Sequence, residues 1–347
     1  MDVLYVTDSP INNSIGRYTM DLYRITAPDS HIVQFVFNRA NLSLEYGDYA
    51  LGYNLRYPFS AFNHMFSRYI FRDKKMEIEA SKSIVHITSS TSYIPIEKSN
   101  VVVTIHDLFA FEDAYKDDYP GIVGFSIRRS TQKYLKCKNI VVDSNHVKEQ
   151  ILERFDLNEG RLTVIYVAIP ENMHPLERKN EIRNELNLPQ DKKLILSVTN
   201  NSKRKNLPMI QNVIDHISDE YKIVRVGPPL KNSINLGSMD DVTLNKVYNA
   251  CDALFFPTVA EGFGIPVIEA FAVGLPVVSS SIDVIREVAG DAALLVDPMD
   301  LTENLEGIYK ATENTNYYRR KGLERAKMFS RDTIKERLVN FYKGLEE

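Results

Sequence analysis

Short apolar runs alternate with amphipathic stretches along most of the chain. The runs are rich in β-branched residues and read as strands at residues 3–7, 32–37, 83–87, 101–105, 140–142, 163–167, 194–198, 222–226, 253–256, 276–279 and 293–296. Between them, segments such as YTMDLYRIT, HVKEQILERF, TLNKVYNACD and DVIREVAG carry apolar residues at helical spacing. Strands that alternate with helices predict an α/β fold built from doubly wound parallel sheets.

One polar segment interrupts this alternation and predicts a domain boundary. Residues 168–193 are polar, contain three prolines and precede a fresh strand. A chain of 347 residues is also longer than one ordinary hydrophobic core requires. We therefore expect one domain over residues 1–172 and a second over residues 173–328, each with its own sheet.

The composition is that of a globular protein. Hydrophobic residues make up 44% and charged residues 25% of the chain, and a net charge of -4 gives no electrostatic reason to expect a nucleic acid partner. The first residues lack the pattern of a signal peptide, and no apolar run reaches the roughly 18 residues of a membrane span. Cys137 and Cys251 have no metal-type spacing, so we expect two buried thiols in a reducing cytoplasm.

Polar residues at the predicted strand ends locate the chemistry, because ligands of such sheets bind beyond the carboxyl ends of the strands. In the first domain, His106 and Asp107 directly follow the strand at 101–105. They form either part of a ligand site or a satisfied histidine beside an aspartate that caps the next turn. Gly16, after the first strand, would let a ligand approach the backbone, although the dinucleotide pattern G-x-G-x-x-G is missing.

The second domain carries basic residues at such a strand end. Thr199 and Asn200 close the strand at 194–198, and the run Lys-Arg-Lys at 203–205 precedes a helical pattern. This arrangement suits a multiply charged phosphate group, although a short basic run is also common in a solvated turn. Gly227 ends the next strand, where a flat ligand could approach the chain.

The stretch EGFGIPVIEAFAVG is apolar but contains two carboxylates, Glu261 and Glu269. Its first glycines predict a loop, Pro266 predicts the first turn of a buried helix, and Gly274 predicts the end of that helix. Two buried carboxylates without donors would be costly, and a polyhydroxy ligand would supply hydroxyl donors to them. The amides between the two acids would lie at a helix N-terminus, which suits a diphosphate.

With RKNL upstream and EVAGDAALLVDPMD downstream, this stretch resembles the retaining family-four glycosyltransferases of GT-B fold, also called group 1. It is most similar to the mannosyltransferase-like members. The resemblance covers nearly the whole second domain and extends more loosely into the first through TIHDLFAFEDAY, VVDSNHVKEQIL and VIYVAI. It implies two Rossmann-like domains that face each other across a cleft. Residues 1–172 would be the acceptor side, residues 173–328 would bind the nucleotide-sugar, and a helix at 329–347 would cross back to the first domain.

The resemblance also implies roles for individual residues. Glu269 matches the acid that holds the donor ribose, Glu261 the acid that faces the hexose, and Lys205 the lysine that neutralises the departing diphosphate. His106 matches a histidine near the transferred sugar, and Gly16 the glycine of the first loop. The catalytic residues expected on this basis are His106, Lys205 and Glu261. The donor-binding residues expected are Gly16, Thr199, Asn200, Arg204, Lys205, Gly227, Glu261, Gly262, Phe263, Gly264, Ile265 and Glu269.

One departure from the family pattern bears on donor affinity. Thr199 and Asn200 stand where the family often has glycine and arginine, so one of the two usual phosphate cations is missing. Arg204, beside Lys205, is the candidate replacement, unless the local helix geometry points it away.

The implied activity is retaining transfer of a hexose from a nucleotide-sugar to a glycan, glycolipid or lipid-linked saccharide. Mannose from GDP-mannose is the first candidate for the donor, and a UDP-hexose such as UDP-glucose is the second. The chain contains no Asp-x-Asp motif, so we expect transfer without a metal and without a cofactor beyond the donor. Two alternatives stay open: an inactive or weak sugar-nucleotide-binding module, and a GT-B nucleotide-sugar epimerase. Turnover with a donor would exclude the first.

The acceptor class depends on residues 54–75, which mix Phe and Tyr with Arg and Lys. Such a segment can lie on the anionic inner face of a membrane, and it can equally be a core helix with a basic outer face. The first interpretation would make this cytoplasmic protein peripheral at the membrane and would favour a lipid-linked acceptor.

Overall fold

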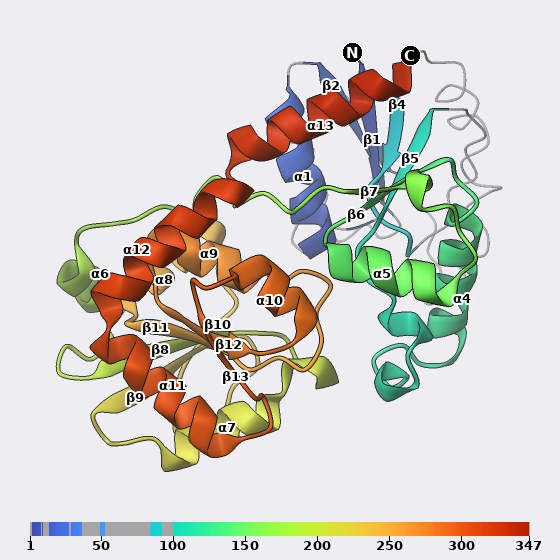
Figure 1. The fold of residues 1–347 in the computed structure, drawn as a ribbon. Coiled ribbons are helices and arrows are strands. Elements are labelled where there is room, and N and C mark those ends of the chain that lie inside the picture. Colours follow the sequence, from blue (N-terminus) through green and yellow to red (C-terminus); the bar gives the residue numbers. More distant parts are fainter. Residues whose placement is uncertain are drawn as a thin grey trace. The chain divides into compact units, whose positions relative to one another are not determined.

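The structure of the chain is a computed structural model that describes residues 2–7, 9, 14–27, 29–36, 49–52, 84–91 and 100–346. The chain divides into two compact units (Figure 1). The first unit contains Met1–Val167 and Ile334–Glu347, and the second contains Ala168–Thr333. The chain therefore leaves the first unit, forms the whole second unit, and returns to the first for its last residues.

The first unit is a parallel sheet with helices on both faces. Its elements are β1 (Val3–Thr7), α1 (Ser14–Thr26), β2 (Ser30–Val36), β3 (Tyr49–Gly52), β4 (Ile84–Ile87), β5 (Val101–Ile105), α4 (Gly121–Tyr134), β6 (Asn139–Val142), α5 (Asn145–Arg154), β7 (Leu162–Val164) and most of α13 (Arg331–Glu346). The described strands form one sheet in the order β3-β2-β1-β4-β5-β6-β7, and all the pairs are parallel. The order reverses between β1 and β4, which makes this point the switch point of the sheet.

The two faces of this sheet differ in chemistry. Leu4 and Val6 of β1 pack in an apolar core with Val147 and Ile151 of α5. On alternate positions, side chains point to the opposite face, which carries a buried polar network. There the His86 ring binds the Tyr342 hydroxyl of α13 through Nδ1 (2.6 Å) and the Thr104 hydroxyl of β5 through Nε2 (2.7 Å). Burial lowers the pKa of His86 to about 3, so this histidine is neutral.

The second unit repeats the architecture. Its elements are α6 (Lys179–Glu185), β8 (Lys193–Val198), η4 (Lys203–Lys205), α7 (Leu207–His216), β9 (Tyr221–Val226), β10 (Ile234–Gly237), α8 (Asp241–Ala250), β11 (Ala253–Phe256), α9 (Ile265–Val273), β12 (Val277–Ser280), α10 (Asp283–Ala289), β13 (Leu294–Val296), α11 (Leu301–Glu313) and α12 (Thr315–Ala326). The strands form a parallel six-stranded sheet in the order β10-β9-β8-β11-β12-β13. Helices α7 and α11 pack on one face, and α8 and α9 on the other (Figure 1).

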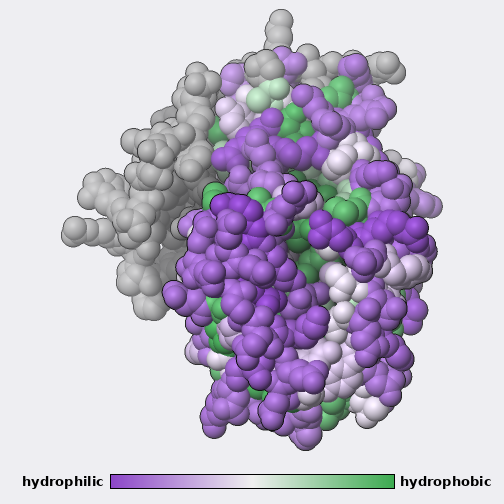
Figure 2. All heavy atoms as spheres, turned by 90° about the vertical axis from the view of Figure 1, so that its left-hand side faces the viewer, coloured by the Kyte–Doolittle hydropathy of each residue, from purple (hydrophilic) through white to green (hydrophobic). Residues whose placement is uncertain are grey.

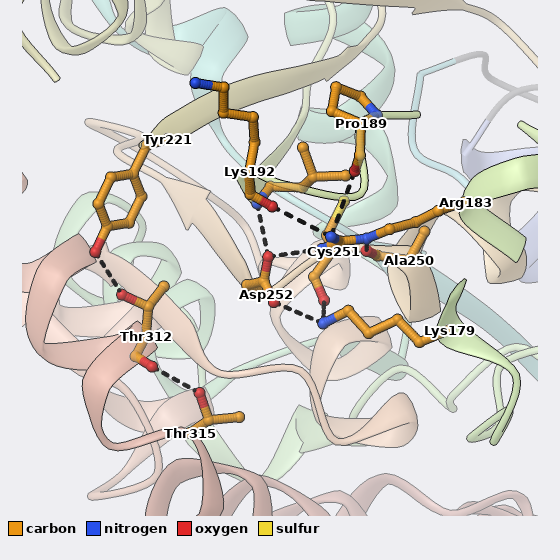
Figure 3. A network of polar contacts seen from close by, with 11 residues as sticks. Lys179, Arg183, Pro189, Lys192, Tyr221, Ala250, Cys251, Asp252, Thr312 and Thr315 are labelled. Carbon is orange, nitrogen blue, oxygen red and sulfur yellow. Dashed lines mark hydrogen bonds and ion pairs between the residues drawn. The ribbon is translucent and has the colours of Figure 1, made fainter. Parts of the chain in front are cut away.

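A network of charged residues fixes the amino-terminal edge of this second sheet (Figure 3). Asp252, just before β11, accepts from Lys179 Nζ (2.7 Å), Arg183 Nη2 (2.8 Å) and the amide of Leu194 at the start of β8 (2.6 Å). Arg183 also donates to the carbonyls of Ala250, Pro189 and Lys192. The network joins α6 to two neighbouring strands at the edge opposite the carboxyl ends, so its role is structural.

The predicted pattern of strands is confirmed, because each predicted run overlaps an observed strand. Two further strands, β3 and β10, were not predicted. Strand β10 is the four-residue sequence INLG at the edge of the sheet and is only partly buried. A short edge strand with polar residues lacks the apolar run by which buried strands are recognised.

None of the helices in the described ranges is long and apolar enough to cross a membrane. The face of the molecule shown in Figure 2 is mostly hydrophilic, with hydrophobic residues in small separate patches. Residues 54–75 lie outside the described residues, so their contact with a membrane stays a prediction.

Candidate active site

The carboxyl ends of β8 and β11 form the centre of the candidate site. The order of the second sheet reverses between these two strands, because the chain continues from β8 to β9 and β10 on one side and later adds β11 on the other. Loops that leave the sheet at such a point diverge and leave room for a ligand. The η4 turn follows β8 there, and residues 257–264 follow β11.

Two cations of η4 meet one carboxylate from the loop after β11. Arg204 Nη1 lies 2.8 Å from Glu261 Oε2, and Lys205 Nζ lies 2.5 Å from Glu261 Oε1. Lys205 Nζ also lies 5.0 Å from the centroid of the Phe256 ring. Glu261 and Lys205 are buried at 7% and 8% exposure, so their ion pair is largely withdrawn from water. The structure thus brings together three of the residues that the sequence singled out.

Backbone contacts hold η4 and this loop together. The amide of Val259 donates to the carbonyl of Arg204 (2.8 Å). Thr258 Oγ1 lies 2.9 Å from the same carbonyl and 2.8 Å from Glu261 Oε1. Asn206 adopts the left-handed conformation at the start of α7, and its side-chain Nδ2 donates to the carbonyl of Pro257 (3.0 Å). These contacts fix the cations relative to the carboxylate, although the two segments are more than fifty residues apart in sequence.

The electrostatics favour an ionised Glu261. Burial alone would raise the pKa of this carboxyl, but the charges of Lys205 and Arg204, with hydrogen bonds from Lys205 and Thr258, lower it below its usual value. The cluster of Lys205, Arg204 and Glu261 therefore carries two positive charges and one negative charge. The remaining positive charge suits an anionic ligand.

Helix α9 begins as the sequence predicts. Gly264 adopts a φ of 102° before the helix, Pro266 lies in its first turn, and Gly274 closes it at a φ of 73°. The φ of Gly264 strains any residue with a side chain, so the loop favours glycine in this place. Phe263 is buried, with its ring edge-on to Phe329. The amides of Gly262 to Ile265 thus belong to a loop and helix N-terminus of defined geometry.

Glu269 lies inside α9 and is buried. Its Oε2 accepts a hydrogen bond from the Tyr248 hydroxyl of α8 (2.6 Å). The structure therefore gives Glu269 a hydroxyl donor from the protein itself, whereas Glu261 has the two cations of η4.

Thr199 and Gly227 are packed against each other at the ends of β8 and β9. Gly227 has a φ of 126°, and a Cβ there would lie 2.0 Å from the carbonyl oxygen of Thr199. Only glycine fits this close approach. Asn200 is exposed, and its Oδ1 accepts from the amide of Ser202 (3.0 Å), which shapes the turn into η4.

In the first unit, the carboxyl ends of three neighbouring strands surround His106. Its Nδ1 lies 2.6 Å from Asp143 Oδ2, after β6, and its Nε2 lies 2.8 Å from the carbonyl of Thr88, after β4. A carbonyl oxygen can only accept a hydrogen bond, so Nε2 carries a proton. The other ring nitrogen, Nδ1, faces the carboxylate of Asp143. Burial alone would lower the pKa of His106, but the charge and hydrogen bond of Asp143 and the Thr88 carbonyl raise it to about 9. His106 is therefore an imidazolium at neutral pH.

The Tyr18 ring of α1 lies edge-on to His106, with 4.8 Å between the ring centroids. Gly16 is buried two residues earlier in the same helix. These contacts bring two predicted residues, Gly16 and His106, to the same part of the first unit.

Sequence reasoning missed three residues of these sites. These are Thr258, Asn206 and Asp143. Thr258 follows β11, Asp143 follows β6, and Asn206 connects η4 to the loop after β11. The signal for Thr258 and Asp143 was their place just after β11 and β6. Ser144 caps α5, because its Oγ accepts from the amide of Val147 (3.2 Å).

Comparison with known proteins identifies the second unit. Residues 178–328 match the family model for glycosyl transferases group 1. The second unit is a group 1 glycosyltransferase domain. The predicted family is thereby confirmed for this part of the chain.

Curated relatives agree with this family, and solved structures show the fold. The O-antigen chain mannosyltransferase RfbU of Salmonella typhimurium is 28% identical over an alignment of 258 residues, and the match covers 69% of each chain. O-antigen chain mannosyltransferase B of Escherichia coli is 34% identical over 113 residues, which are 32% of this chain and 30% of that protein. The crystal structure of the glycosyltransferase WaaG covers 99% of this chain and 100% of its own, at 13% identity and a TM-score of 0.77. Anabaena HepE, solved with UDP and glucose, covers 99% of both chains at 13% identity and a TM-score of 0.78. The fold is therefore GT-B, as predicted.

Proposed function

We propose that the protein is a retaining glycosyltransferase that moves a hexose from a nucleotide-sugar to a glycan, glycolipid or lipid-linked saccharide. Mannose from GDP-mannose is the first candidate and a UDP-hexose the second. The observation that carries the proposal is the meeting of Lys205, Arg204 and Glu261 at the switch point of a sheet that belongs to the group 1 domain. The names of the O-antigen mannosyltransferases support mannose and a polysaccharide acceptor.

The proposed chemistry assigns each charge a task. Lys205 and Arg204 stabilise the diphosphate as the bond from the anomeric carbon to its oxygen breaks, together with the amides before α9. Glu261 faces the hexose and holds the two cations in place. Glu269, held by Tyr248, receives the ribose hydroxyls. The acceptor attacks from the same face, and the departing phosphate takes its proton.

In this mechanism His106 is not assigned the role of a base. An imidazolium with both N–H groups directed at acceptors cannot take a proton from the acceptor hydroxyl. The roles of His106 and Gly16 toward the transferred sugar stay predictions.

The test has two steps. Calorimetry with GDP, UDP and ADP, with and without EDTA, should find one nucleotide that binds without metal. Donor turnover is then measured with labelled GDP-mannose and UDP-hexoses on a panel of saccharide acceptors, and NMR determines the anomeric configuration. An α-linked product from an α-linked donor is expected, and a β-linked product would contradict retention. Nucleotide binding without turnover on any acceptor would instead favour the inactive binding module.

A further inference from the structure

Arg225 is a cation buried in the centre of the second sheet. It lies on β9, between Val224 and Val226, at 0% exposure, and it heads the largest fully buried side chains of the described chain. Strands of a parallel sheet that is covered on both faces are normally apolar throughout. An arginine at such a position is costly unless something compensates its charge.

The partners of Arg225 are all neutral. Nη2 donates to the carbonyl and the hydroxyl of Thr199 (2.9 and 2.8 Å), and Nη1 donates to the carbonyls of Ser197 and Val226 (both 3.1 Å). Within the described residues no carboxylate pairs with it, and its buried Nε has no hydrogen-bond partner. Burial lowers the pKa of Arg225 only to about 10, so the guanidinium keeps its charge at neutral pH.

A second buried arginine has a carboxylate that compensates its charge. Arg183, at 5% exposure, has its Nη2 2.8 Å from the carboxylate of Asp252, as Figure 3 shows. That pair lies at the amino-terminal edge of the sheet. Arg225 has no such carboxylate among the described residues, and its contacts lie at the carboxyl edge, where the nucleotide-sugar is proposed to bind.

The Arg225 guanidinium lies close to the candidate site. Thr199, which accepts two of its hydrogen bonds, directly follows β8, and Gly227 follows β9 two residues after Arg225. A Cβ on Gly227 would lie 3.2 Å from Nη2 of Arg225. The charge therefore lies directly behind the backbone of Thr199 and Gly227.

We propose that Arg225 is a positioning residue whose uncompensated charge selects the diphosphate of the donor from behind Thr199 and Gly227. The inference rests on the proposed function. The guanidinium fixes Thr199 through its carbonyl and hydroxyl, and an anionic group at this strand end supplies the counter-charge that the described part of the protein does not. Because the interior has a low dielectric constant, the charge acts on the ligand without direct contact.

The test compares a ligand that carries the diphosphate with one that lacks it. Calorimetry measures the affinities of the wild type, Arg225→Met and Arg225→Lys for GDP and guanosine, or for UDP and uridine if the uracil nucleotide is the one that binds. Arg225→Met should lower the affinity for the diphosphate about tenfold and that for the nucleoside less than about twofold. Arg225→Lys, which keeps the charge, should keep the ratio of the two affinities within about threefold.

Arg183→Met serves as the matched control, because it also removes a buried arginine of the second unit. It should lower the melting temperature without changing the ratio of diphosphate to nucleoside affinity. A purely structural role of Arg225 predicts the same result for Arg225→Met, and that outcome would overturn the proposal. If Arg225→Met does not fold, Arg225→Lys serves as the test. The proposal is then overturned if folded Arg225→Lys has a ratio of diphosphate to nucleoside affinity that is tenfold or more below that of the wild type. Failure of the wild type to bind any nucleoside diphosphate would reject the proposed function itself and is thus distinguishable.

Discussion

Lys205 Nζ lies 2.5 Å from Glu261 Oε1, so the cation proposed to stabilise the departing diphosphate has a carboxylate partner within the protein. The pair joins a turn after β8 to a loop after β11 across the switch point of the sheet. Glu261 thereby places Lys205 where charge develops in the proposed reaction. A cation fixed in advance stabilises developing charge without the cost of reorienting during the reaction.

Removal of the Lys205 amine should affect catalysis more than the fold. We expect Lys205→Ala to lower kcat about 100-fold to 1000-fold, because the leaving diphosphate loses a preorganised cation. Lys193→Ala is the matched control, since Lys193 is exposed at the opposite end of β8. Steady-state kinetics with the identified donor would check both variants. Equal kcat values for the two variants would contradict the role of Lys205.

Neutralising Glu261 should separate binding from transfer. In Glu261→Gln the two cations lose their shared carboxylate, so the affinity for the nucleoside diphosphate should rise about threefold to tenfold. Transfer should become slower, because the group proposed to face the hexose has lost its charge. Calorimetry and kinetics on the same preparation measure the two effects, with the exposed Glu220→Gln as control. Weaker diphosphate binding by folded Glu261→Gln would argue against this prediction, in which the Glu261 carboxylate competes with the diphosphate for the two cations.

The His106–Asp143 pair should make stability depend on pH in a defined window. The folded pKa of His106, about 9, lies above its ordinary value of 6.5, so the folded state binds the proton more tightly. The stabilisation is therefore fully present below pH 6.5 and is lost as the pH rises through 9, by up to about 3 kcal/mol. Urea unfolding of the wild type and His106→Gln at pH 6.5 and 9 tests this. If the free energy of unfolding falls equally in the two proteins between pH 6.5 and 9, groups other than His106 cause the pH dependence.

Two glycines at neighbouring strand ends offer a matched comparison. A Cβ at Gly227 would lie 2.0 Å from the carbonyl of Thr199, whereas a Cβ at Gly237 would have no neighbour within 4 Å. Both have positive φ, so Gly237→Ala shares the backbone strain, of about 1 kcal/mol, without the clash. Gly227→Ala should lower nucleoside diphosphate affinity more than about tenfold and Gly237→Ala less than about threefold. Calorimetry measures the two affinities. Similar losses of affinity in Gly227→Ala and Gly237→Ala would show that the ligand does not bind beside Gly227.

Asp252 should matter for stability alone. Asp252→Asn leaves Lys179 and Arg183 without their carboxylate and should lower the free energy of unfolding by about 3 kcal/mol. Glu306→Gln breaks an exposed helical pair with Lys310 and should cost less than about 0.5 kcal/mol. Activity per folded molecule should be unchanged in both. Denaturant unfolding and kinetics measure these quantities, and a drop in kcat for folded Asp252→Asn would contradict a purely structural network.

The sequence predicted the features that depend on local order along the chain. The strands with apolar runs, the first turn of α9 with Pro266 and the end of that helix before Gly274 follow from residues close in sequence. The carboxyl-end rule also located His106 and the basic run before α7. These signals suffice because strand direction and turn chemistry are set locally.

Pairing between distant segments could not be predicted in the same way. The sequence suggested ligand hydroxyls as the donors for Glu261, but its partners in the structure are Arg204 and Lys205, 57 and 56 residues earlier. Arg225 was overlooked within VRVGPP because a single polar residue in an apolar run usually marks a strand face exposed to water. Its burial depends on the β8 and β10 neighbours on either side, which no local pattern specifies.

The division of the chain has a consequence for its synthesis. The second unit is one continuous segment, whereas the His86 ring of the first unit binds a hydroxyl, Tyr342, that is translated 256 residues later. During translation, the second unit can therefore complete its contacts while the first unit still lacks the helix that covers its polar face. The first unit thus cannot complete its contacts until α13 has been translated.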